Sequence, residues 1–125
     1  MEFNLEIPQD HFFIRSVSEE GIRVNQDVFN KPVIISGQRI VQDWNVASID
    51  DLNEENLQTV FDLQPEVILI GTGNTQVFLP PATQIHFFRH NVGFEVMTTD
   101  AACRTFNVLA SEGRKVVAAL LPLTP

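Results

Sequence analysis

Two glycines close a short apolar run at residues 65–73, PEVILIGTG, an arrangement that could hold a phosphate where a strand leads into a helix. A P-loop needs Lys followed by Ser or Thr after its second glycine, but Asn74-Thr75 follows Gly73. A dinucleotide-binding fingerprint needs a third glycine where Gln76 stands. The double proline at 80–81 follows soon after and cannot lie inside a helix. The sequence therefore predicts a glycine-dependent turn after a buried strand rather than a nucleotide site.

A histidine pair could bind a metal ion. His86 and His90 stand four residues apart, the spacing of two zinc ligands on one helix. The predicted helix turns both away from an apolar face formed by Ile85, Phe88 and Val92, and no third ligand is evident nearby. We expect surface histidines and no metal.

The single cysteine, Cys103, could act as a nucleophile. A reactive thiolate needs a pKa lowered by a base or a helix N-terminus. Cys103 lies near the start of a predicted helix, but no histidine is placed beside it, so we expect a packed thiol at the edge of the core. One cysteine also precludes an intrachain disulfide, which suits a reducing compartment.

One polar constellation is left, on the predicted helix after Thr99. A narrow stripe opposite the apolar face carries Asp100, Arg104, Asn107 and Ser111. Thr98-Thr99 follows one predicted strand, and Gly71-Thr72-Gly73 follows another. If the two strands are parallel, both loops lie at the carboxyl edge of the sheet, where open α/β sheets bind ligands. We therefore predict a polar cleft formed by Gly71, Thr72, Gly73, Thr98, Thr99, Asp100, Arg104 and Asn107. The alternative is local chemistry only, with a helix cap at Thr98 or Thr99 and an exposed ion pair between Asp100 and Arg104.

The elements that would position this cleft follow from the hydrophobic periods of the chain. Asn53 is expected to cap a helix that buries Leu57, Val60 and Phe61, and the run 67–70 is typical of a strand covered on both faces. Helices from about 81 to Gly93 and from Thr98 or Thr99 to Gly113 then alternate with strands over 94–97 and 115–121. The β-α-β-α-β order over 67–121 predicts an α/β fold with parallel strand pairs. Earlier strands extend or cover that sheet; they are predicted at 12–17, 22–28, 33–36 and 39–44, with a two-residue turn at Gly37-Gln38.

Composition limits the classes of function. A chain of 125 residues predicts a single α/β domain over 1–125. Its net charge is −8, with 16 acidic and 8 basic residues and no basic block, which disfavours nucleic-acid binding. The longest apolar stretch, 116–121, is too short to insert in a membrane. The acidic, alternating N-terminus resembles neither a secretory signal nor a mitochondrial presequence, so we expect a cytoplasmic protein.

Two stretches together resemble a known family. They are PEVILIGTG at 65–73 and GFEVMTTDAACRTFNVLASEGRKVVAALLP at 93–122. The chain is similar over about residues 30–121 to the family of small domains of unknown function that includes mitochondrial respiratory complex I assembly factor 3 and the adipogenesis-associated domain protein. The resemblance implies a three-layer α/β domain with a mixed central sheet, and it implies no established reaction, cofactor or catalytic residues. We expect a bacterial member, since the mitochondrial role requires a presequence that is not evident here.

Two classes of function follow. The first is a non-enzymatic interaction or assembly module with a protein partner, which the resemblance and the lack of a complete catalytic signature favour. The second is small-molecule binding or hydrolysis in the predicted polar cleft. No cofactor is expected in either case.

Overall fold

The computed structural model describes residues 12–125. The N-terminal stretch that we expect not to be a leader peptide lies outside the described residues. The central sheet has five strands in the order β5-β4-β8-β6-β7. β6 pairs in parallel with β7 and β8, whereas β4 pairs antiparallel with β8 and β5. The strands are β4 (Val33–Ile35), β5 (Ile40–Val41), β6 (Val67–Gly71), β7 (Gly93–Met97) and β8 (Val116–Leu120). The sheet is therefore mixed, as expected.

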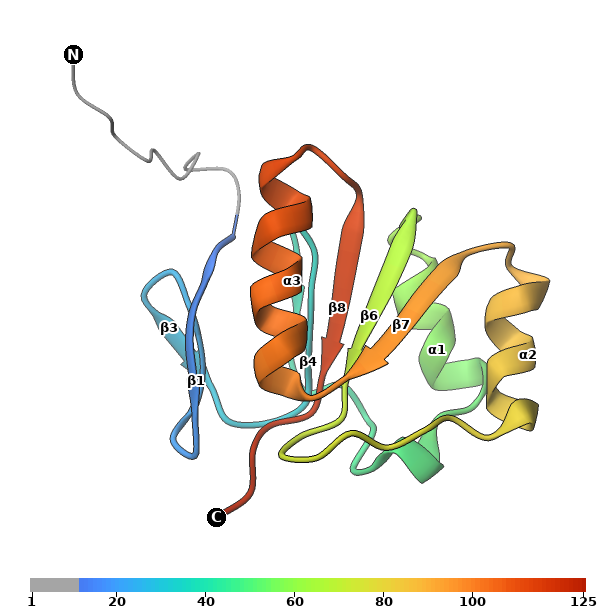
Figure 1. Ribbon diagram of the computed structural model, residues 1–125, viewed down its shortest axis with the longest axis horizontal. Helices are drawn as coiled ribbons and strands as arrows, with labels where there is room; N and C mark the ends of the chain where they lie inside the picture. The colour runs from blue at the N-terminus through green and yellow to red at the C-terminus, as the bar shows by residue number, and fades with distance from the viewer. Residues whose placement is uncertain (1–11) are drawn as a thin grey trace.

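Helices cover both faces of this sheet (Figure 1). α1 (Glu54–Phe61) and α2 (Pro81–Arg89) lie on one face, and α3 (Thr99–Ser111) lies on the other. A separate antiparallel sheet of β1 (Ile14–Ser18), β2 (Gly21–Val24) and β3 (Asp27–Phe29) packs against the outer side of α3. A short 3₁₀ helix, η1 (Ile49–Asp51), precedes α1.

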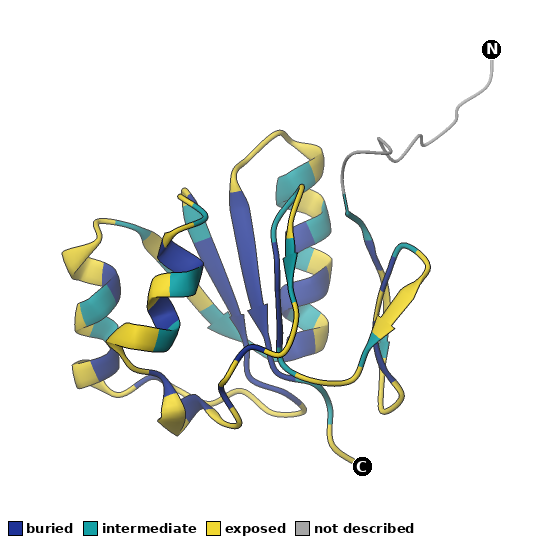
Figure 2. Cartoon of the chain, turned by 180° about the vertical axis from the view of Figure 1, so that it is seen from behind, coloured by how far each residue is buried: buried dark blue, intermediate teal, exposed yellow. Residues whose placement is uncertain are grey.

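Alternate side chains of the central strands fill two hydrophobic clusters. Ile68 and Ile70 of β6 meet α1 and α2, while Leu69 between them meets α3. All five residues of β8 are buried, and Figure 2 shows the central strands of the sheet as mostly buried. This burial on both faces confirms the interpretation of 67–70 as a strand without polar alternation.

The start of α1 and the end of α3 confirm the sequence predictions. Asn53 caps α1: its side chain accepts a hydrogen bond from the Asn56 backbone N–H, and the Asn56 side chain returns one. Gly113 follows α3 in a left-handed conformation, with φ 79°. On the apolar face of α3, Phe106 is fully buried and Leu109 is half-buried.

Three predictions about local structure were wrong, and the first two concern where strands and helices begin and end. The strand expected over 22–28 is a hairpin, β2 and β3, because Asn25 adopts a left-handed turn conformation with φ 53°. α2 ends at Arg89, the left-handed residue after it is Asn91, and the glycine expected to end it, Gly93, begins β7.

The buried face of α2 was also misassigned. Thr83 and Phe87 are buried, whereas Ile85 and Phe88 are exposed. α2 lies beside β7 at the margin of the sheet, so only a narrow stripe of the helix meets the core, and Phe87 packs there against Phe61 and Phe94.

Candidate functional site

The structure brings the two predicted loops together at the carboxyl ends of β6 and β7. The backbone N–H of Gly73 donates to Thr99 Oγ1 over 2.8 Å, and the N–H of Thr99 donates to the Gly73 carbonyl over 3.0 Å. The Thr72 N–H donates to the Met97 carbonyl over 2.9 Å, and its hydroxyl donates to the Thr75 carbonyl over 2.6 Å. Thr72 and Thr99 are both buried, so their hydroxyls serve internal hydrogen bonds.

The two glycines of this turn serve different purposes. A Cβ on Gly71 would lie 2.9 Å from the Thr99 Cα, because the start of α3 crosses closely over β6. Gly73 instead has φ 95°, which a residue with a side chain adopts only with strain. The Gly-Thr-Gly sequence is thus explained by a close approach and a chain reversal.

The C-terminal residues pass over the same edge of the sheet. The Leu121 N–H donates to the Gly71 carbonyl over 3.0 Å, and the Thr99 hydroxyl donates to the Leu121 carbonyl over 2.5 Å. Further along, the Asn74 side chain donates to the Thr124 carbonyl over 3.0 Å and accepts from the Thr124 N–H over 2.7 Å. A ligand placed between the two loops would have to share this edge with the C-terminal segment.

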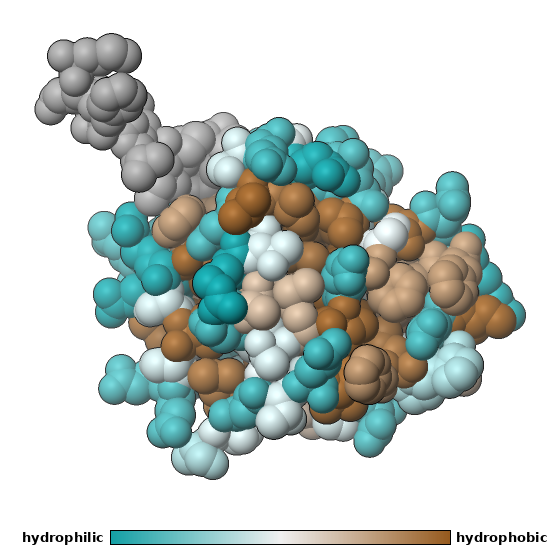
Figure 3. All heavy atoms as spheres, in the orientation of Figure 1, coloured by the Kyte–Doolittle hydropathy of each residue, from teal (hydrophilic) through white to brown (hydrophobic). Residues whose placement is uncertain are grey.

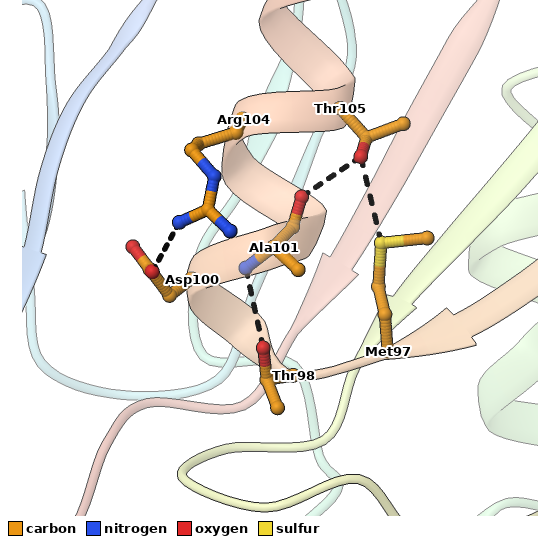
Figure 4. A network of polar contacts seen from close by, with 6 residues as sticks. All are labelled: Met97, Thr98, Asp100, Ala101, Arg104 and Thr105. Atoms are coloured by element: carbon orange, nitrogen blue, oxygen red, sulfur yellow. Dashed lines mark hydrogen bonds and ion pairs between the residues drawn. The ribbon is translucent and has the colours of Figure 1, made fainter.

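Figure 4 shows Asp100 and Arg104 on one side of the first turns of α3 and Thr105 on the other side, next to Met97. Thr98 is the N-cap and accepts from the Ala101 N–H over 3.3 Å. Arg104 and Asp100 form an ion pair one turn apart, and both side chains are more than half exposed. Asn107 lies against the three-stranded sheet. Its side-chain amide accepts a hydrogen bond from the Ile14 N–H and donates one to the Ile14 carbonyl. The amide of Asn107 thus anchors β1 to α3.

The other candidate groups are held by the core or lie at the surface. Burial raises the pKa of the Cys103 thiol from 9.0 to about 12, and the Asp100 carboxylate contributes in the same direction while Arg104 opposes it. A thiol with such a pKa is protonated at neutral pH and is a poor nucleophile. His86 is half-buried, and the exposed His90 stacks on Phe61 with the ring centroids 3.7 Å apart. Residues 12–125 contain no cluster of three or more His, Cys, Asp or Glu arranged to hold a metal ion.

An exposed apolar surface was missed at the sequence level. Six large apolar side chains are exposed among the described residues, and four of them belong to the segment 77–88. We call these four the α2 surface: Val77, Phe78, Ile85 and Phe88. Phe78 is 82% exposed and Phe88 65% exposed, and Figure 3 shows apolar atoms gathered over α2 and β7. The sequence also allows a helix that buries a stripe of Thr83 and Phe87. In that orientation of the helix, Ile85 and Phe88 face outward and form an exposed apolar surface.

Comparison with known proteins gives consistent relatives. The model of a family described as "Protein of unknown function (DUF498/DUF598)" matches residues 14–121. The chain is 36% identical over 119 residues to NADH dehydrogenase [ubiquinone] 1 alpha subcomplex assembly factor 3 of Mus musculus, covering 94% of this chain and 63% of that protein. It is 32% identical to a 13 kDa major membrane protein of Francisella tularensis, covering 74% of this chain and 76% of that protein. A crystal structure of a Bordetella parapertussis protein superposes with a TM-score of 0.84 at 36% identity, covering 92% of this chain and 98% of that one.

The chain spans less than two thirds of the length of the assembly factor from Mus musculus. In the described part of the chain, the helices are too short and too polar to cross a bilayer.

Proposed function

The chain belongs to the DUF498/DUF598 family of proteins of unknown function, and on that premise we propose that it is a non-enzymatic protein-interaction or assembly module. Relatives that cover nearly all of this chain carry the name of an assembly factor for NADH dehydrogenase. An assembly factor must present a surface to another protein. The observation that supports such a surface here is the α2 surface.

Apolar side chains gathered at one place on a soluble surface usually mark a contact site. The large aromatic residues Phe78 and Phe88 would contribute most to such a contact, because aromatic side chains bury large areas and dominate interface energetics. Phe88 also packs edge-to-face on Phe94 of β7, with the ring centroids 5.9 Å apart, which holds its ring in place. A positioned aromatic ring loses less conformational freedom on binding than a mobile one.

The strand beside this surface is an edge of the sheet. β7 pairs with β6 on one side only, and on its other side the Gln76 side chain donates to the Val96 carbonyl over 3.0 Å. An edge strand next to apolar side chains suits a partner that adds an extended segment to the sheet and inserts its side chains beside α2. We therefore place the partner contact along β7 and the α2 surface.

The test is affinity capture from extract of the native cell, followed by native mass spectrometry. The unmodified chain should carry a protein partner at fixed stoichiometry. The double variant Phe78→Ser with Phe88→Ser should capture at least ten-fold less of the partner. It should keep its fold, since a substitution at an exposed apolar position changes the free energy of unfolding by only about 0.5 kcal/mol.

Val108→Ser is the matched control. Val108 is also an exposed apolar residue, but it lies on α3. Its substitution should leave the capture unchanged. A chain that always elutes alone, or equal losses in the control and the double variant, would contradict the proposal.

The alternative proposal is a small-molecule or hydrolytic role in the polar cleft of Gly71, Thr72, Gly73, Thr98, Thr99, Asp100, Arg104 and Asn107. Its support is the contact between Gly73 and Thr99 and the exposed side chain of Arg104 on the helix that Thr99 begins. A thermal-shift screen with nucleotides, sugars and acyl compounds tests it, because a ligand at about 100 times its Kd stabilises a protein by about 2.7 kcal/mol. A ligand that stabilises the chain, with the effect lost in Arg104→Ala, would favour this role over the first.

A further inference from the structure

A hollow lies at the end of the sheet opposite to the Gly-Thr-Gly turn, where β6 and β8 begin. It has a volume of about 350 Å³, within the range of small-ligand pockets. Three turns surround it: the hairpin between β4 and β5, the exit of α1 and the exit of α3. Its charged lining residues are Arg39, Arg114 and Lys115, and no carboxylate lines it among the described residues.

The exit of α3 brings two of these cations to the rim. Gly113 takes the left-handed conformation, its N–H donates to the Ala110 carbonyl over 3.0 Å, and the Arg114 N–H donates to the Leu109 carbonyl over 3.1 Å. This is the Schellman closure of a helix, and it turns the chain back toward the start of β8. The closure also occupies terminal carbonyls of α3, whose negative ends would otherwise oppose an anion.

The charge of the hollow is opposite to that of the chain. The net charge is −8, yet three of the 8 basic residues line this one hollow. Glu66 partly neutralises Arg114, with its Oε2 at 3.8 Å from Arg114 Nε, and its Oε1 accepts from the Lys115 backbone N–H over 2.8 Å. Among the described residues, neither the Lys115 ammonium nor the Arg39 guanidinium forms an ion pair.

The inner lining is apolar. Val116 and Val117 are buried at the start of β8, Pro65 is buried after α1, and Leu63 and Ala110 are half-buried at the sides. A hollow with cations on the rim and aliphatic side chains beneath favours a ligand with a charged end and an apolar body. Burying that body would add to the attraction at the rim.

We propose that this hollow binds a small amphipathic organic anion. Arg39 and Lys115 hold its carboxylate or phosphate headgroup, and its apolar body lies over Leu63, Pro65 and Val116. This site is independent of the protein contact proposed along β7, because none of its residues belongs to β7 or to the α2 surface.

The experiment is a ¹H–¹⁵N NMR titration of the full chain at constant ionic strength with octanoate and with octyl phosphate. Either probe should saturate and shift the amides of the two turns, residues 36–39 and 113–115. Tighter binding of one probe assigns the headgroup. The neutral probe 1-octanol and inorganic phosphate should each bind at least ten-fold more weakly, because each supplies only one of the two contacts.

Two variants and a control connect the shifts to the cations. Arg39→Gln and Lys115→Gln should each weaken binding on the order of ten-fold, as expected when one charge-assisted hydrogen bond is lost. Arg23→Gln removes an exposed cation from β2 and should leave the affinity unchanged. The proposal is overturned if neither probe gives saturable shifts at these turns, if 1-octanol or inorganic phosphate binds equally well, or if Arg23→Gln weakens binding as much as the other two variants.

Discussion

The hydroxyl of Thr99 should be costly to remove, because it is a buried group that forms two hydrogen bonds. Thr99 is fully buried at the start of α3, and its Oγ1 accepts from the Gly73 N–H and donates to the Leu121 carbonyl. Thr99→Val keeps the side-chain shape but leaves two buried backbone groups without those partners. An unsatisfied buried group costs about 1–3 kcal/mol, so we expect the loss of two partners to lower the free energy of unfolding by about 2–6 kcal/mol.

Urea unfolding followed by tryptophan fluorescence measures this loss. Trp44 is the only tryptophan and is buried in the cluster that contacts α1, so its emission reports on global unfolding. Thr99→Ser is the matched control, since it keeps the hydroxyl and removes only a methyl group, and it should cost about 1 kcal/mol. A loss of less than about 1 kcal/mol in Thr99→Val, or an equal loss in Thr99→Ser, would refute the reasoning.

Three further predictions concern single residues. Gly71→Ala should destabilise the fold by about 1–3 kcal/mol because its Cβ would lie 2.9 Å from the Thr99 backbone, whereas Gly93→Ala, whose nearest neighbour is 3.8 Å away, should be nearly neutral in the same urea assay. Arg104→Ala should lower the free energy of unfolding by less than about 1 kcal/mol in thermal melts, because its ion pair with Asp100 is exposed; a larger loss would show that the pair is a structural latch. Burial raises the pKa of Cys103 to about 12, so the unfolded chain loses the thiol proton first, and stability relative to Cys103→Ala should fall between about pH 9 and 12. Parallel pH profiles of the two proteins would contradict that last prediction.

The sequence predicted those parts of the fold that local chemistry decides. Asn53 and Gly113 mark the start of α1 and the end of α3 because capping depends on a few neighbouring residues. The position of both loops at one edge of the sheet followed from topology, since parallel strands bring the loops after them to the same edge. These predictions needed no knowledge of distant packing.

Other features depend on packing that a sequence pattern does not encode. In the sequence the stripe of Ile85, Phe88 and Val92 is the more apolar one, and only the position of α2 beside β7 decides that Phe87 is buried and Phe88 exposed. The pairing of Asn107 with Ile14 joins residues far apart in the chain. The cationic hollow likewise forms only when three separate turns meet, so Arg39, Arg114 and Lys115 give no joint signal in sequence.

The polar groups at the two ends of the sheet differ in the contacts that they form. At the carboxyl ends of the parallel strands, where open α/β folds usually bind ligands, the backbone groups of Leu121 and Thr124 bond Gly71, Thr99 and Asn74. A ligand there competes with contacts that the chain already makes, so its binding must shift the amides of those residues and disturb the C-terminal segment. At the amino ends, a ligand meets the side chains of Arg39 and Lys115, and the contacts already made there are those of Glu66 with Arg114 and with the Lys115 N–H. Binding at this end should leave the amides of the C-terminal segment in place and shift the turns at 36–39 and 113–115 instead. One titration of the full chain therefore separates the two sites by which set of amides moves.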